Sequence, residues 1–269
     1  MSVINTNVSS LFAQASIKVN AREMQHAMSS LSTGKRINSA VDDAAGSGIA
    51  STMTADIRGL TQAVRNANDA ISLLQTADGA LIETTNMLQR MRELAVQATS
   101  GTYSTQQLSY NDKEYQALLL QIGKVASETK WNGITTGAVN AFTFGASSNA
   151  SATVAVNTVA TDVAGLALTG SMVTTEVLGT TAVGLVDAAL DIVNGQRAAL
   201  GAGVNQLTYA GDNMQNIATN TAASRSRIED TDYAVATTTL AKTQIIQQAA
   251  TAMLAQANQQ PQSVLALLK

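Results

Sequence analysis

The residues of this chain that could perform acid–base chemistry are few and scattered. The single histidine, His26, lies between Gln25 and Ala27 in a stretch with polar neighbours. A nucleophile and its base need a positioned histidine or a buried carboxylate cluster, so we interpret this imidazole as a surface or interface residue. The sequence has no His-Glu-x-x-His, no phosphate-binding glycine loop and no Gly-x-Ser-x-Gly elbow. We expect no enzymatic activity and no catalytic residues.

Two adjacent carboxylates, Asp42 and Asp43, are the first candidates for metal binding. No third ligand lies nearby, and both residues stand where a helix is predicted to begin. Acidic side chains are favoured at that position because they accept hydrogen bonds from free backbone N–H groups. Cysteine is absent, which excludes thiol chemistry and cysteine-ligated zinc. We expect neither a metal site nor a bound cofactor.

The densest polar cluster combines two arginines with carboxylates on two predicted neighbouring helices. It comprises Gln89, Arg90, Arg92, Glu93 and Glu114, with the apolar Leu94 among them. Local ion pairs on a solvated helix face contribute only about a few tenths of a kcal/mol each. The residues alone favour that simple interpretation, although an arginine beside a leucine can also anchor a protein interface.

The elements that hold these residues begin and end with apolar stripes at heptad spacing. One stripe comprises Ile4, Val8, Leu11 and Ala15, and the other comprises Ile246, Ala250, Met253 and Ala257. Steps of three and four predict helices with one apolar face. Both faces are narrow and flanked by uncharged polar residues, so neither helix can bury much apolar area alone or with a single partner. We therefore expect the two ends to meet and to form a surface for assembly.

Two longer seven-residue repeats predict the remaining long helices. The first runs from Ile57 to Leu88 with the polar Asp78 among its seam positions, and the second runs from Val186 to Ala218 with Arg197 in its seam. Because the chain goes out and returns, these helices should pair in antiparallel fashion.

A shorter helix should lie between the two long repeats. It opens at Ser104, where Gln107 completes a capping box, and it ends before the turn-forming pair Asn132 and Gly133.

Residues 132–180 have a different texture, with alternating Val, Thr, Ala and Phe. This alternation is typical of β-hairpins, and Phe142 and Phe144 share one face of such a strand, which we expect to cover the flank of the helices. The fold class is therefore predicted to be mainly α: an elongated antiparallel coiled-coil rod with paired N- and C-terminal helices and a small β-hairpin region in the middle.

Composition narrows the classes of function further. The chain has 269 residues, with 3% aromatic and 13% charged residues and a formal charge of −3. Without a basic run, binding to nucleic acid is not expected. No window reaches the roughly 18 apolar residues of a membrane span, and the N-terminus has no signal-peptide pattern. We expect no membrane insertion and, if the chain is exported, no cleaved signal peptide.

Four segments, in order, resemble those of bacterial flagellins. They are residues 32–46 (STGKRINSAVDDAAG), 88–98 (LQRMRELAVQA), 224–234 (SRSRIEDTDYA) and 254–268 (LAQANQQPQSVLALL). The resemblance covers nearly the whole chain outside its middle. It implies a structural subunit that polymerises into the flagellar filament for swimming motility, in a short form that lacks additional outer domains. The alternative within the same machinery is a hook-filament junction protein.

The resemblance also implies a division into domains. Residues 1–40 with 231–269 would form an inner-tube terminal domain, and residues 41–131 with 181–230 an outer-tube helical rod. Residues 132–180 would form a short variable β-hairpin region. The stripe residues named above would then line the contacts of the inner tube.

Partners and location follow from the same resemblance. Flagellins leave the cell unfolded through the flagellar type III pathway and form an extracellular homopolymer. The flagellar cap and hook-junction proteins, and an export chaperone at the C-terminal helix, are the implied partners. In many members the helical motif contacts Toll-like receptor 5, and the matching positions here are Gln89, Arg90, Glu93, Leu94 and Glu114. That face could equally serve contacts between subunits.

Overall fold

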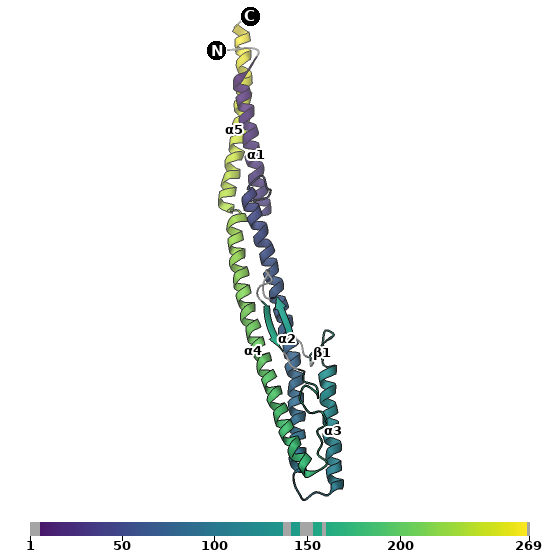
Figure 1. Cartoon of the computed structure of the whole chain (residues 1–269). Helices are drawn as coiled ribbons and strands as arrows, with labels where there is room; N and C mark the ends of the chain where they lie inside the picture. Colours follow the sequence, from purple (N-terminus) through teal and green to yellow (C-terminus); the bar gives the residue numbers. More distant parts are fainter. Residues whose placement is uncertain (1–5, 137–140, 146–152, 158–159, 268–269) are drawn as a thin grey trace. The chain divides into compact units, whose positions relative to one another are not determined.

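The computed structural model describes residues 6–136, 141–145, 153–157 and 160–267, with side chains over 6–136 and 160–259. The described chain is mainly helical (Figure 1). Its helices are α1 (Val8–Thr33), α2 (Ala44–Ala98), α3 (Thr105–Glu128), α4 (Glu176–Glu229) and α5 (Tyr233–Leu267). Its strands are β1 (Lys130–Trp131), β2 (Ile134–Thr135), β3 (Ala141–Gly145) and β4 (Thr153–Asn157). The predicted class, mainly α with a small β-hairpin region, is confirmed.

Local sequence signals set the helix ends. The side chain of Asn7 accepts a hydrogen bond from Ser10 N at the start of α1, and Gly34 ends this helix in a left-handed conformation with φ of 71°. The predicted capping box at α3 is present, with Ser104 and Gln107 bonded reciprocally.

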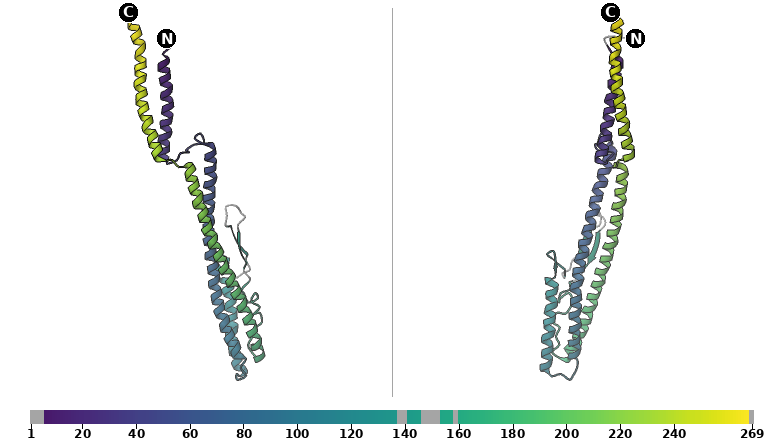
Figure 2. Two further views of the ribbon diagram at one scale, coloured as in Figure 1. Left: turned by 90° about the vertical axis from the view of Figure 1, so that its left-hand side faces the viewer. Right: turned by 180° about the vertical axis from the view of Figure 1, so that it is seen from behind.

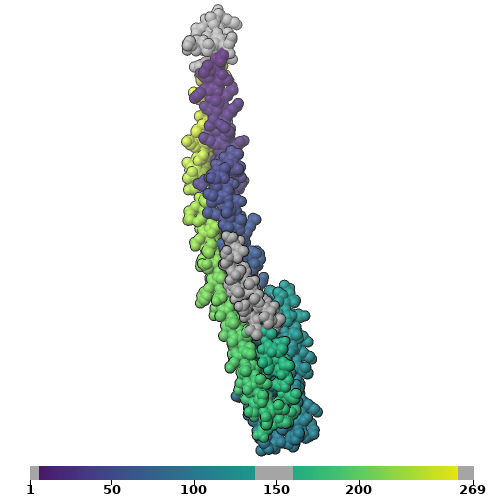
Figure 3. Space-filling view, in the orientation of Figure 1, coloured from purple at the N-terminus to yellow at the C-terminus, as the bar shows by residue number. Residues whose placement is uncertain are grey.

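The chain divides into two compact units. The terminal unit comprises the chain up to residue 55 and from residue 220 onward, and the central unit comprises residues 56–219. In the terminal unit α1 and α5 lie side by side, as the views of Figure 2 show, and the space-filling view of Figure 3 shows them in contact. Asn7 bonds Ala257 whereas Asn20 bonds Thr243, so the two helices run antiparallel.

The central unit packs α2, α3 and α4 around one apolar core. Ion pairs join Arg92 to Asp187 and Asp78 to Arg197, so α2 and α4 run antiparallel as expected. Among the described side chains, the largest that is fully buried is Tyr115 of α3, whose hydroxyl lies 3.1 Å from Ser171 Oγ and donates to it. Core residues from all three helices include Leu74, Leu88, Met91, Ile122, Val186, Leu200 and Leu207.

Both predicted hairpin features are present in the middle of the chain. Asn132 and Gly133 have φ of 47° and 81° and close the turn between β1 and β2, as their sequence indicates. Trp131 packs against the core of the central unit. Strands β3 and β4 pair antiparallel from Ala141 opposite Asn157 to Gly145 opposite Thr153. The side chains of Phe142 and Phe144 lie outside the described residues, so their predicted packing stays a prediction.

The helix after the middle region begins earlier than predicted, and the segment before it differs from the expected strands. Residues 160–175 contain turns rather than strands. Asp162 accepts a hydrogen bond from Gly165 N in one of these turns, and Leu166, Leu168 and Val173 enter the core. The hydroxyl of Thr175 then accepts from Leu178 N, so α4 begins at Glu176 rather than near residue 181.

Candidate assembly site on the terminal helices

The pairing of α1 with α5 depends on a buried amide. The side chain of Asn20 is 5% exposed, and its Nδ2 donates to Thr243 O at 2.8 Å and to Gln247 Oε1 at 3.1 Å. A buried asparagine in a helix pair loses its hydrogen bonds if the helices slide. This contact therefore fixes the register of the pair.

A second polar contact holds the outer end of the pair. Asn7 Nδ2 donates to Ala257 O at 2.8 Å. Among the side chains that the structure describes in α1 and α5 (up to residue 259), the other buried residues are small: Ser10, Ala27, Ser30, Ala236 and Thr243. Small residues let two helix backbones approach closely, but they bury little apolar surface.

The predicted apolar stripes therefore remain largely outside the α1–α5 contact. Val8, Leu11, Ala15, Ile246 and Met253 are exposed, whereas Ala250 and Ala257 are half-buried. Ile4 lies outside the described residues. The sequence analysis missed Phe12, which is 76% exposed and follows Val8 by four positions, and it also missed the polar contacts of Asn7 and Asn20. Helical spacing could have identified Phe12.

Three of these exposed side chains, Val8, Phe12 and Met253, border a groove between the two helices. Its volume is about 570 Å³, and its lining comes from Val8, Ser9, Phe12, Ala13 and Ser16 of α1 and Ala250, Met253 and Ala257 of α5. We name this surface the terminal groove. Contiguous exposed apolar surface on a protein marks a site of association.

Two linkers meet at the inner end of the pair. Arg36 N donates to Glu229 O at 2.7 Å, and Thr231 N donates to Gly34 O at 3.0 Å, so the chain between α1 and α2 pairs like a strand with the chain between α4 and α5. An ion pair of 2.5 Å joins Lys35 Nζ to Glu229 Oε1. This linker clasp brings together two of the four segments on which the resemblance rests.

The two carboxylates that precede α2 have different local roles. Asp43 Oδ1 accepts from Gly46 N at 2.9 Å. Asp42 Oδ2 accepts from the backbone N–H groups of Ser39 and Asn38, and these hydrogen bonds hold the pKa of Asp42 below its usual value. His26 Nε2 lies 3.2 Å from Asp42 Oδ1. The capping interpretation is confirmed for Asp43, which accepts from a backbone N–H in the first turn of α2, whereas Asp42 instead holds the turn that precedes this helix.

The polar cluster of the central unit is an ion-paired helix surface. Arg90 Nε donates to Glu114 Oε1 at 2.9 Å and Arg90 Nη1 donates to Glu93 Oε2 at 2.8 Å. The hydrogen bonds to Glu114 and then Glu93 raise the pKa of Arg90. Gln89 is exposed beside them, whereas Leu94 is 2% exposed and belongs to the core. Four of the five candidate contact residues are thus available at the surface.

Other classes of site were sought in the described part of the chain. Within residues 6–136, 141–145, 153–157 and 160–267, no three His, Asp or Glu residues gather as a metal ion would require. Over the same ranges, no helix combines the length and apolar character needed to cross a bilayer.

The paired ends, the helical central unit and the terminal groove define a helical structural subunit. Residues 4–136 match the bacterial flagellin N-terminal helical region, and residues 183–268 match the bacterial flagellin C-terminal helical region. A flagellin of Halalkalibacterium halodurans is 39% identical over 99% of this chain and 100% of its own length. A flagellin of Xenorhabdus nematophila is 39% identical over 100% of this chain and 99% of its own length.

Other relatives agree with these matches. The flagellar filament 33 kDa core protein of Treponema phagedenis is 37% identical over 99% of this chain and 100% of its own length. The crystal structure of Bacillus cereus flagellin is 32% identical, with a TM-score of 0.51 over 60% of this chain and 94% of that chain. The chain belongs to the bacterial flagellin family, and it is a structural subunit of the flagellar filament, which lies outside the cell. These findings favour the filament subunit over the hook-filament junction protein.

Proposed function

We propose that the chain polymerises through the terminal groove and the exposed stripes of α1 and α5. The observation that carries this proposal is that the α1–α5 pair buries small and polar residues while Val8, Phe12 and Met253 face outward. In this assignment residues 1–40 and 231–269 form the inner tube of the filament, and residues 41–131 and 181–230 form the outer tube. Residues 132–180 form a short variable region on the outside.

The free energy of burying these apolar side chains is large enough to support polymerisation through the terminal groove. Full burial of a Val, Phe or Met side chain contributes about 1.5–3 kcal/mol. Three such side chains on every subunit supply several kcal/mol at each added contact, because every copy both offers and receives apolar surface. A contact of this kind, repeated head to tail, produces an open helical polymer rather than a closed dimer.

The proposal is tested by seeded polymerisation followed by electron microscopy. We expect filaments from the full chain and none from a chain that lacks residues 231–269. A finer comparison uses Phe12→Ser and Phe12→Leu, since Leu keeps the apolar surface and Ser removes it. We expect Phe12→Ser to raise the critical concentration for polymerisation at least tenfold and Phe12→Leu to change it little. Equal critical concentrations for both variants would refute the role of the groove.

The ion-paired surface of α2 and α3 is a candidate contact with Toll-like receptor 5 of an animal host. Support comes from the exposure of Gln89, Arg90, Glu93 and Glu114. A receptor reporter assay with monomer and with filament separates the alternatives, using Arg90→Ala against Arg65→Ala as a control on the same helix. Loss of signal for Arg90→Ala alone supports the receptor role. Normal signalling with impaired polymerisation assigns the surface to subunit contacts.

The proposed function also includes export of the subunit and contact with the flagellar cap and hook-junction proteins. As a flagellin, the chain would leave the cell through the flagellar type III pathway and meet the cap and hook-junction proteins outside. An export chaperone would cover α5, whose Ile245, Ile246 and Met253 are exposed in the free chain. Co-purification from the cytoplasm of full-length chain and of chain lacking residues 231–269 tests this partner. We assign the chain no enzymatic activity.

A further inference from the structure

The α5 wall of the terminal groove depends on one large side chain. Helix α5 contributes Ala250, Met253 and Ala257 to the lining, so Met253 supplies most of the apolar surface of this wall. The opposite wall, from α1, has Val8 and Phe12 among its residues. The thioether of Met253 is also the oxidisable group among the three α5 residues, so the chemistry of this wall can change at that position.

The thioether of Met253 is accessible on the free chain. This residue is 66% exposed, against 46% for Met28 and also for Met172. An oxidant must reach a methionine sulfur to convert it to the sulfoxide, and exposed methionines are a common site of such oxidation. Among the methionines whose side chains the structure describes, we expect Met253 to react first.

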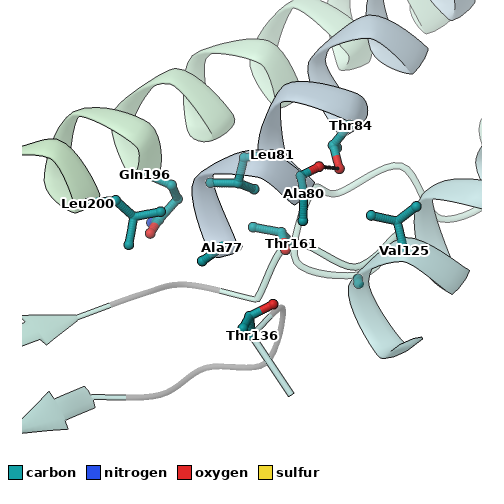
Figure 4. A pocket seen from close by; sticks show the side chains of 10 residues that line it. Ala77, Ala80, Leu81, Thr84, Val125, Thr136, Thr161, Gln196 and Leu200 are labelled. Carbon is teal, nitrogen blue, oxygen red and sulfur yellow. Dashed lines mark hydrogen bonds between the residues drawn. The ribbon is translucent and has the colours of Figure 1, made fainter. Parts of the chain in front are cut away.

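Two methionines in the core of the central unit provide the comparison. Met91 of α2 and Met214 of α4 are buried in that core. A cavity lies among α2, α3 and α4 (Figure 4), but its lining, which includes Leu81 and Leu200, contains neither methionine. Packing therefore shields both sulfur atoms, and they should react slowly as long as the chain stays folded.

Hydrogen peroxide converts a thioether to a sulfoxide in one step. A lone pair of the Met253 sulfur attacks one peroxide oxygen, and the O–O bond breaks as the S–O bond forms. The departing hydroxide takes up the proton of the transferred oxygen and leaves as water. The sulfur loses two electrons and the peroxide gains them. The flexible apolar side chain thereby becomes a polar one.

A sulfoxide in the terminal groove opposes burial of that groove. The lining around Met253 is apolar apart from Ser9 and Ser16, and Ser16 Oγ already donates to Phe12 O at 3.0 Å. A polar group that loses its water without gaining a hydrogen-bond partner is costly to bury. An oxidised chain should therefore associate more weakly. Its own fold should be unaffected, because the free chain leaves Met253 largely exposed.

We propose that Met253 is an oxidation site through which peroxides regulate assembly of the chain. Oxidation of the free chain prevents its addition to a polymer, whereas burial in the polymer protects the same sulfur. This inference rests on the proposed role of the terminal groove in polymerisation. The modification is reversible, because methionine sulfoxide reductases return the sulfoxide to the thioether.

Peptide mass spectrometry after graded treatment with hydrogen peroxide tests the site. On the unpolymerised full chain we expect Met253 to oxidise at least tenfold faster than Met91 and Met214. In seeded filaments the rate for Met253 should fall at least fivefold. A rate for Met253 no higher than that of the two core methionines, or an unchanged rate in filaments, would overturn the proposal.

The critical concentration for polymerisation tests the consequence. Peroxide should raise it at least fivefold for the wild type, and a methionine sulfoxide reductase should restore it. Met253→Leu keeps the apolar surface and removes the sulfur, so its assembly should resist peroxide. Met28→Leu is the matched control on α1 and should stay as sensitive as the wild type. Equal sensitivity of Met253→Leu and the wild type, or a lower Tm of the treated wild type, would refute a specific effect at Met253.

Met253→Gln separates this inference from the proposed function. Glutamine places a polar group at this position without oxidation, and we expect it to raise the critical concentration at least fivefold. If Met253→Gln assembles normally, polymerisation does not bury this position, and both the groove assignment at Met253 and the oxidation inference fail. If Met253→Gln assembles poorly but peroxide leaves the wild-type sulfur unreacted, the groove keeps its role and the oxidation inference alone is refuted.

Discussion

Arg197 of α4 donates from its Nε to Oδ1 of Asp78 on α2 at 2.9 Å, so the two charged residues that interrupt opposing heptad seams pair with each other. Each side chain is a little over one-third exposed. Each residue alone weakens its apolar stripe, and only the antiparallel register observed here places one opposite the other. The pair therefore identifies the correct alignment of two long helices.

A double-mutant cycle at this pair should show modest coupling. Partly exposed ion pairs contribute about 0.2–1 kcal/mol, and we expect a coupling energy near the upper end of that range for Asp78→Ala and Arg197→Ala. Urea unfolding of the four proteins measures it. A coupling indistinguishable from zero would show that the pair does not select the register energetically.

Replacement of Asn20 should separate stability from specificity in the terminal unit. Asn20→Ala removes two hydrogen bonds and leaves Thr243 O without this donor, which should cost about 1–3 kcal/mol. Asn20→Leu should restore stability but permit sliding of α1 along α5. Circular dichroism measures the first effect and seeded filament growth the second. Normal growth with Asn20→Leu would contradict a role in register.

Acid should weaken the turn that Asp42 caps. Hydrogen bonds from Ser39 N, Asn38 N and Ser39 Oγ, and the nearby His26, lower the pKa of Asp42. A carboxyl with a lowered folded-state pKa stabilises the fold above its unfolded value of about 4, and this contribution is lost as the pH falls through the folded-state pKa. Asp42→Asn should therefore flatten the acid limb of the unfolding curve of the terminal unit. An acid limb identical to that of the wild type would exclude this group as its source.

Tyr115 should make the stability of the central unit depend on pH in the alkaline range. Burial raises the pKa of Tyr115 above its usual value of about 10. The neutral phenol stabilises the fold below pH 10, and that contribution is lost as the pH rises through the folded-state pKa. Tyr115→Phe removes the hydrogen bond to Ser171 and should cost about 0.5–1.5 kcal/mol at neutral pH while reducing the loss above pH 10. Thermal unfolding from pH 7 to 11 measures both effects.

The sequence predicts what local signals and periodicity can encode. The capping box of Ser104, the left-handed Gly34 and the turn at Asn132 are where their residue types indicate, because each depends on its own backbone conformation. The antiparallel pairing of α2 with α4 follows from long heptad repeats with few competing registers.

The details of the assembly site were harder to predict from the sequence, because they depend on contacts between residues that are distant in the sequence. Heptad reasoning places apolar side chains between two helices, yet Asn20 and small residues form the α1–α5 contact, and Phe12 faces outward. A pattern of apolar residues indicates that a face will be covered, but it does not say by which molecule. Leu94 shows the converse, since its place beside exposed charges gives no sign that it lies in the core.

The hydrogen bond from Asn7 to Ala257 joins residues 250 positions apart, nearly the full length of the chain. Bringing two such distant residues together costs conformational entropy, and this loop-closure cost grows with the logarithm of their separation. The contacts between α1 and α5 offset that cost only when both helices are present. Because α1 and α5 lie at opposite ends of the sequence, one helix of the pair is made first and the other last. The groove between α1 and α5 consequently exists only when both helices are present, so the fold itself delays association until synthesis of the chain has supplied the second helix.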